Sequence, residues 1–157
     1  MAKYKPKSRD ELRKLVKDNN IYLGDIDTSN VTNMGGLFIK SDRVDFSGIE
    51  LWDTSKVVDM RNMFNIAERF NQPLDNWDTS SVEFMTFMFL KALSFNQNLD
   101  SWNVSNVCDN QKMFENSGIT TLPKWHKNTP LFSDLDDYFS MIEVIEKVVE
   151  KAKATLM

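Results

Sequence analysis

The feature that most constrains this chain is a phrase of ten residues that occurs twice, 25 positions apart. Residues 71–80 read NQPLDNWDTS, and residues 96–105 read NQNLDSWNVS. The tryptophans of this phrase belong to a column of anchor positions with spacings of 26, 25, 25 and 23, namely Ile26, Trp52, Trp77, Trp102 and Trp125. A fixed internal period is typical of repeat proteins, in which each unit buries its apolar face against its neighbours.

Other positions recur with the same period. Serine lies three residues after each of the first four anchors and valine five residues after, as at Ser55 and Val57. A pair ending in phenylalanine follows, at Leu37-Phe38, Met63-Phe64, Met88-Phe89 and Met113-Phe114. These columns divide the chain into an N-terminal segment (1–20), about four repeats (21–126) and a C-terminal segment (127–157).

The apolar residues inside one repeat have helical spacing. Val57, Met60, Met63, Phe64 and Ala67 form a stripe that predicts a short helix with one buried face. A Thr-Ser pair precedes the stripe at 54–55, where hydroxyl groups can cap a helix. The segment 70–77 contains a proline and predicts a short extended strand that ends in a turn.

The unit FNQPLDNWDTSSVEFMTFMFLKA, residues 70–92, resembles the repeat of the BspA-like leucine-rich repeat family, the Mycoplasma-type lipoprotein repeat. The first repeat departs from that pattern at Ile26 and at Gly35-Gly36-Leu37, and the fourth departs at Asn110. The resemblance implies a leucine-rich-repeat-like solenoid and a protein-binding role, frequently on bacterial surfaces. We therefore predict an α/β fold, a short leucine-rich-repeat-like solenoid with a strand and a short helix per unit and a capping helix at each end.

The two end segments carry helix signals of their own. Ser8 and Glu11 have the spacing of a capping box, so residues 1–20 are expected to hold a helix that covers the first repeat. Ser133 opens a second predicted helix, whose apolar positions alternate in steps of three and four up to Leu156. Two alternatives stay open for this C-terminal helix: it packs on the repeats, or it pairs with a second copy to form a homodimer or with a partner helix.

The residues that could carry chemistry are few. The chain has one histidine, His126, and one cysteine, Cys108, which lie outside any triad or thiolate metal pattern. Its five glycines form neither a phosphate loop nor a dinucleotide motif. We predict no catalytic residues, no cofactor and no metal, and therefore a protein that is not an enzyme.

Carboxylates recur in two columns, one through Glu50, Asp75 and Asp100, and one through Asp27, Asp53 and Asp78. Three interpretations are possible: side chains that bond the local backbone in turns, a calcium site, or an acidic face that receives a basic partner. The predicted partner-binding residues lie on the strand-turn segments of the repeats; they are Glu50, Gln72, Asp75, Asn76, Asp78, Gln97, Asp100 and Ser101.

The composition limits the class of partner. The net charge is −4, which argues against nucleic acid, and no run of 18 apolar residues is present, which argues against a membrane partner. The lysine-rich start lacks the apolar stretch of a secretory signal, so a cytoplasmic location is expected. The sequence predicts a non-catalytic protein-binding module that occludes a toxin or effector, as an immunity protein does; the alternative is a bacterial surface or exported adhesin-type repeat protein.

Overall fold

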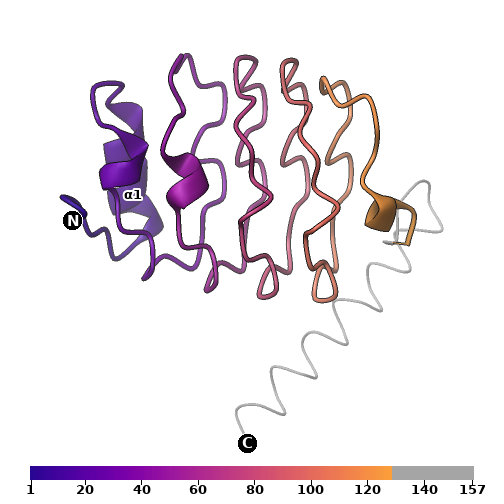
Figure 1. Cartoon of the computed structure of the whole chain (residues 1–157), viewed down its shortest axis with the longest axis horizontal. Coiled ribbons are helices and arrows are strands. Elements are labelled where there is room, and N and C mark those ends of the chain that lie inside the picture. The colour runs from indigo at the N-terminus through magenta and orange to yellow at the C-terminus, as the bar shows by residue number, and fades with distance from the viewer. Residues whose placement is uncertain (129–157) are drawn as a thin grey trace, which may run out of the picture.

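A computed structural model describes residues 1–128 of the chain. The repeats follow one another as stacked coils, and each coil lies beside the coils of the preceding and following repeats (Figure 1). The helix α1, Arg9–Lys17, lies beside the first coil, at the end of the stack where the chain begins. The C-terminal helix predicted to begin at Ser133 lies outside the described residues, as does the rest of the C-terminal segment (127–157) apart from its first two positions.

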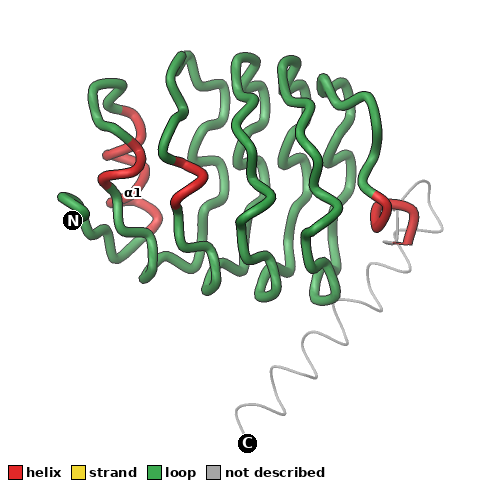
Figure 2. Tube along the Cα trace, viewed as in Figure 1, coloured by secondary structure: helices red, strands yellow, loops and turns green. Residues whose placement is uncertain are grey.

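The predicted secondary structure within the repeats is wrong. Besides α1, residues 1–128 contain three 3-10 turns, η1 (Leu23–Asp25), η2 (Ile49–Leu51) and η3 (Lys124–Asn128). The only β-pairing in this part of the chain is a set of isolated parallel bridges: Tyr4 with Ile26, Asn33 with Asp59, Asp59 with Phe84, and Phe84 with Asp109. Most of the tube in Figure 2 is loop and turn. The fold is therefore not the predicted α/β leucine-rich-repeat-like solenoid with a strand and helix in each unit and capping helices.

The backbone of the methionine stripe explains why no helix forms there. Asn62 and Ile66 adopt the left-handed conformation, with φ of 57° and 58°, and Phe87 and Lys91 repeat this in the next unit. A left-handed residue at every fourth position interrupts a right-handed helix. The chain instead turns through i to i+3 bonds, such as the N–H of Met63 to the carbonyl of Met60 at 3.2 Å.

The backbone N–H groups of the stripe are used between repeats. The alternate residues of the second repeat donate to the third repeat in one direction: Met60 to Phe84, Asn62 to Thr86, Phe64 to Met88 and Ile66 to Leu90, at 2.8–3.0 Å. The same ladder joins the first repeat to the second and the third to the fourth. An α-helix needs these N–H groups for its own carbonyls, so the ladder between repeats replaces the helical bonds.

The predicted core columns form the core. The phenylalanine rings of the Met-Phe column stack nearly parallel, with centroids 5.5 Å apart from Phe38 to Phe64 and from Phe64 to Phe89, and 5.7 Å apart from Phe89 to Phe114. Each Trp indole donates from Nε1 to a backbone carbonyl of the preceding repeat, as Trp77 does to Ile49 at 3.0 Å. Three buried threonines, Thr28, Thr54 and Thr79, form a third column, in which Thr54 donates from Oγ1 to the carbonyl of Asp78 at 3.0 Å. Polar and apolar ladders together fill the interior and satisfy its backbone groups.

The helix predicted after Ser8 is present as α1. Ser8 Oγ accepts a hydrogen bond from the N–H of Glu11 at 3.2 Å, and Leu12 and Val16 are buried against the repeats. Arg43 of the first repeat, itself 3% exposed, ties the end of this helix in place. Its guanidinium donates to four backbone carbonyls, those of Asp45, Val16, Asp18 and Ile21. No helix in residues 1–128 is long and apolar enough to cross a bilayer.

Candidate functional site

Hydrogen bonds between successive copies of the repeated phrase hold part of the predicted binding face in place. Gln97 donates from Nε2 to Oδ1 of Asn71 at 2.9 Å and to the Asn71 carbonyl at 3.1 Å. Asn71 Oδ1 also accepts from the N–H of Asn96, at 2.9 Å, and Asn96 Oδ1 accepts in the same way from Thr120 in the next repeat, at 3.0 Å. The amide side chains thus bridge copies of the phrase, and their positions on the surface are fixed.

The column that contains Asp78 forms turns. Asp78 Oδ1 accepts from the N–H of Ser80 at 2.9 Å and from its hydroxyl at 2.6 Å, and these bonds hold the pKa of Asp78 below its usual value. Asp53 does the same with Ser55, and Asn103 fills the position in the fourth repeat. Asp53 and Asp78 therefore bond the local backbone in turns, which is the first of the three interpretations given above for the carboxylate columns. Asp78 stays exposed at the surface.

Three more of the predicted residues also have structural contacts. Asp100 accepts from the N–H of Lys124 at 2.8 Å and lies 3.4 Å from its ammonium group, and the backbone bond is the main cause of a lowered pKa of Asp100. Ser101 donates from its hydroxyl to the carbonyl of Asp75 at 3.0 Å. Glu50 accepts from the N–H of Gly48 at 2.9 Å. These contacts fix the side chains but leave Asp100 and Ser101 exposed.

The remaining three predicted residues are Gln72, Asp75 and Asn76. Their side chains have no hydrogen-bonding or ionic partner among residues 1–128, and Asp75 and Asn76 are exposed while Gln72 is half-buried. Groups of this kind can bond a partner without breaking a contact within the protein. All three come from the first copy of the phrase, residues 71–80.

A small hollow lies on the same face between the last two repeats. It has a volume of about 190 Å³, and the predicted residues Gln97 and Asp100 both line it. Sequence reasoning missed two of its other lining residues, Thr120 and Leu122. Leu122 is 46% exposed although its column is buried in the preceding repeats at Leu74 and Leu99. The shorter spacing between the last two anchors was the available signal that this part of the fourth repeat differs.

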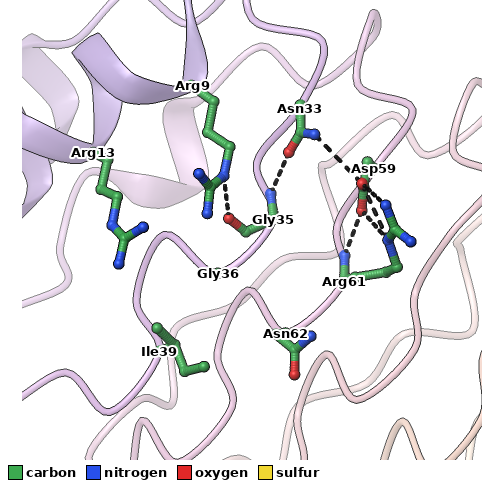
Figure 3. A pocket seen from close by; sticks show the side chains of 9 residues that line it. All are labelled: Arg9, Arg13, Asn33, Gly35, Gly36, Ile39, Asp59, Arg61 and Asn62. Carbon is green, nitrogen blue, oxygen red and sulfur yellow. Dashed lines mark hydrogen bonds and ion pairs between the residues drawn. The ribbon is translucent and has the colours of Figure 1, made fainter.

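A larger hollow, of about 490 Å³, lies between α1 and the first two repeats and contains none of the eight predicted residues. Figure 3 shows Arg9 and Arg13 both extending from α1 at its rim. Arg9 donates from Nε to the carbonyl of Gly35, whereas Arg13 has no hydrogen-bonding or ionic partner among residues 1–128. The helical spacing of the two arginines and the Gly35-Gly36 departure were the signals in the sequence.

The opposite side of the larger hollow contains a buried carboxylate. Asp59, 8% exposed, accepts two-pronged hydrogen bonds from Arg61, with its Oδ2 atom 2.6 Å from Arg61 Nη2. Asn33 donates to the same carboxylate at 3.4 Å. The guanidinium of Arg61 also lies 5.0 Å from the ring centroid of Phe84. Asp59 is therefore neutralised locally, and Arg61 is held at the wall of the hollow.

The groups considered for catalysis or metal binding are separate from these hollows. Burial raises the pKa of the Cys108 thiol, whose sulfur contacts the Glu83 carbonyl at 3.3 Å. His126 is 9% exposed, and burial lowers its pKa. Within residues 1–128 no three His, Cys, Asp or Glu side chains are grouped so that they could hold a metal ion.

The stacked coils and their polar face define a short repeat protein. The chain matches the family model described as "Mycoplasma protein of unknown function, DUF285" over residues 10–125, and it belongs to that family. The match covers the repeats and α1, and it agrees with the bacterial origin that the sequence resemblance implied. No curated protein and no solved structure matches the chain.

Proposed function

We propose that this chain is a non-catalytic binding module that recognises another protein through the face formed by the repeated phrase. The observation that carries the proposal is the hydrogen bonding between repeats on this face, in which Asn71, Gln97 and Ser101 all take part. Side chains held in place before binding lose less conformational entropy when a partner arrives. The face is therefore pre-organised for recognition.

The composition of the face supports a protein partner. Leu51 occupies the position just before the anchor, the column that also contains Asn76 and Ser101, and it is 67% exposed. Leu122 is exposed beside the smaller hollow. Exposed apolar side chains among polar groups with unused bonding capacity are the usual composition of a protein interface.

The charge of the face favours a basic partner. Asp75 and Asp78 are exposed carboxylates, and Glu50 lies in the same column as Asp75. Asp100 contributes less negative charge, because Lys124 lies 3.4 Å from it. Occlusion of a basic toxin or effector is the specific form of the proposal, as an immunity protein in the cytoplasm would act. An adhesin of the BspA-like kind, bound to an external protein, is the alternative.

The test begins with capture of a partner from the source cell on the immobilised full chain, followed by its purification and identification. Affinity is then measured for the wild type and for the double variant Asp75→Asn/Asp100→Asn. Asparagine keeps an acceptor oxygen at both positions, so folding should be preserved. We expect at least tenfold weaker binding and a smaller dependence on salt.

The matched control removes two charges elsewhere, by Asp10→Asn and Glu68→Gln, at exposed positions off this face. This control should bind as the wild type does. Equal affinity for the wild type and the face variant would reject this face as the binding surface. A partner that is a toxin would support occlusion, whereas a partner on a host cell or matrix would support adhesion.

A further inference from the structure

We propose that the groove beside α1 is a second binding surface, which takes an extended acidic peptide segment of a partner protein. This surface goes beyond the proposed function, since it includes none of the eight residues of the predicted face. Two adjoining hollows make up the groove, of about 490 Å³ and about 170 Å³. They share Arg13, Gly36 and Ile39, so the groove is elongated along α1.

The groove is positively charged although the chain as a whole carries −4. Arg9, Arg13 and Arg61 line the larger hollow, and its one carboxylate, Asp59, is already bonded by Arg61. The adjoining hollow of about 170 Å³ adds two lysines and one carboxylate: Lys17, Lys40 and Asp42. Basic groups thus recur along the length of the groove, and guanidinium groups pair with carboxylates in a two-pronged geometry.

Arg13 is the central group of this surface. It lines both hollows, and its Nε atom is buried without a hydrogen-bonding partner. The terminal guanidinium nitrogens of Arg13 also have no hydrogen-bonding or ionic partner among residues 1–128, so they can pair with a ligand carboxylate. Arg9 is oriented by its bond to the Gly35 carbonyl (Figure 3), and its Nη1 atom lies 3.6 Å from the exposed Asp10 carboxylate, which leaves Nη2 for a ligand.

The first repeat keeps the groove open through its two glycines. Arg61-Asn62, Thr86-Phe87 and Gln111-Lys112 occupy the positions of Gly35-Gly36 in the later repeats. A Cβ atom on Gly36 would lie 3.4 Å from Nη2 of Arg9. Any longer side chain in that direction would enter the space in front of the arginines, so the departure from the repeat pattern coincides with the groove.

The shape of the groove favours a peptide over a free phosphate ion. A single small anion would fill only a fraction of the two hollows, whereas an extended chain can place carboxylates along both. Ile39, which is 37% exposed, lies in the shared part and offers an apolar contact between the basic groups. An acidic segment with interspersed apolar residues matches this arrangement.

The experiment uses the full chain and a fluorescein-labelled peptide of alternating glutamate and leucine, with fluorescence anisotropy as the readout. Arg13→Gln removes the central charge and breaks no bond within residues 1–128. Gly36→Asn narrows the groove at constant charge; the backbone there accepts asparagine, because Asn62 occupies the equivalent position with φ of 57°, close to the 63° of Gly36. Both variants should weaken binding, Arg13→Gln by about tenfold or more.

The control is Lys91→Gln, which removes one exposed positive charge in the third repeat and should leave the affinity unchanged. Thermal melting of each variant checks that the fold is kept. Absence of peptide binding by the wild type, equal binding by wild type and Arg13→Gln, or an equal loss with Lys91→Gln, would overturn the proposal. Full displacement of the peptide by an equal concentration of inorganic phosphate would identify a small-anion site and overturn the assignment to a peptide.

The two surfaces can be separated in this assay. The face variant Asp75→Asn/Asp100→Asn should bind the acidic peptide as the wild type does. Conversely, Arg13→Gln should keep its affinity for a basic partner bound at the predicted face. The assays could therefore reject the groove as a binding surface without affecting the proposed function. They could equally reject the predicted face without affecting the groove.

Discussion

The indole nitrogen of Trp77 donates a hydrogen bond of 3.0 Å to the backbone carbonyl of Ile49, in the preceding repeat. Trp77 is 4% exposed, and Ile49 is fully buried. We expect Trp77→Phe to lower the free energy of unfolding by about 2 kcal/mol or more, because it leaves a buried carbonyl unpaired and opens a cavity. Urea unfolding of the wild type and the variant measures this change.

Trp125 provides the control for this prediction. It makes the same bond, to the Leu99 carbonyl at 2.7 Å, but it lies in the last repeat and is half-buried. Trp125→Phe should therefore cost clearly less than Trp77→Phe, because a half-buried side chain loses less packing and water can enter the space that it leaves. Equal losses at the two positions would contradict this role of burial.

The buried threonine column predicts a hydroxyl effect. Thr79, 1% exposed, donates to the carbonyl of Asn103 at 2.9 Å. Thr79→Val keeps the shape and removes the donor, and we expect it to destabilise the fold by about 1 kcal/mol. Thr79→Ser keeps the hydroxyl and loses a methyl group. Comparison of the two in urea separates the bond from the packing, and a neutral Thr79→Val would show that the bond adds nothing.

The Asp78 turn predicts a pH-dependent contribution. Because the folded pKa of Asp78 is lowered, its stabilisation is present above the unfolded pKa of about 4 and is lost as the pH falls through the folded value. Asp78→Asn should keep the turn, as Asn103 does with Ser105 at 2.7 and 3.0 Å. The stability difference between wild type and Asp78→Asn should therefore narrow below about pH 4.

Asp78→Ala is the matched variant for this series, since it removes the acceptor as well as the charge. It should be less stable than Asp78→Asn at neutral pH, where the turn depends on an acceptor oxygen. Thermal melts between pH 3 and pH 7 give all three curves. A constant difference between wild type and Asp78→Asn across this range would refute the assigned pKa direction.

Arg43 predicts that α1 depends on the first repeat. Replacement by methionine removes donors from four backbone carbonyls, including Val16 and Asp18 at 3.2 Å each, at the end of the helix. We expect a loss of about 3 kcal/mol or more, because four backbone acceptors, one buried and three partly buried, lose their partner at once. Hydrogen exchange should rise first in residues 9–17. Equal acceleration throughout residues 1–128 would indicate global unfolding instead.

The repeat period and the core could be predicted because stacked repeats place equal positions in equal surroundings. The anchor, valine and Met-Phe columns are largely buried, with the exceptions in the fourth repeat, where Val107 and Trp125 are half-buried. The short helix could not be predicted correctly, because the spacing of Met60 and Met63 suits 3-10 turns as well as an α-helix. The left-handed residues that decide between them are Asn62, Ile66, Phe87 and Lys91, and only the first is of a type that favours this conformation.

Part of the candidate site could be predicted from the repeat pattern, and the groove beside α1 could not. Asp78 acts within its own copy of the repeated phrase, so the repeat pattern was enough to suggest a turn. The groove depends on how α1 lies against the first repeat. Arg9 and Gly35 are 26 positions apart, but Arg9 lies outside the repeats, so the two residues are not equivalent positions of successive units. Periodicity carries no information about such a contact.

The ladder between repeats has a consequence for how this family can change in length. Alternate backbone N–H groups of the stripe bond carbonyls 24 or 25 positions later, and the next repeat offers the same carbonyls again. A tandem duplication of residues 77–101 would therefore supply every donor with an acceptor in register. Unequal recombination can lengthen or shorten such a chain in one step, while α1 and Arg43 have to stay with the first repeat.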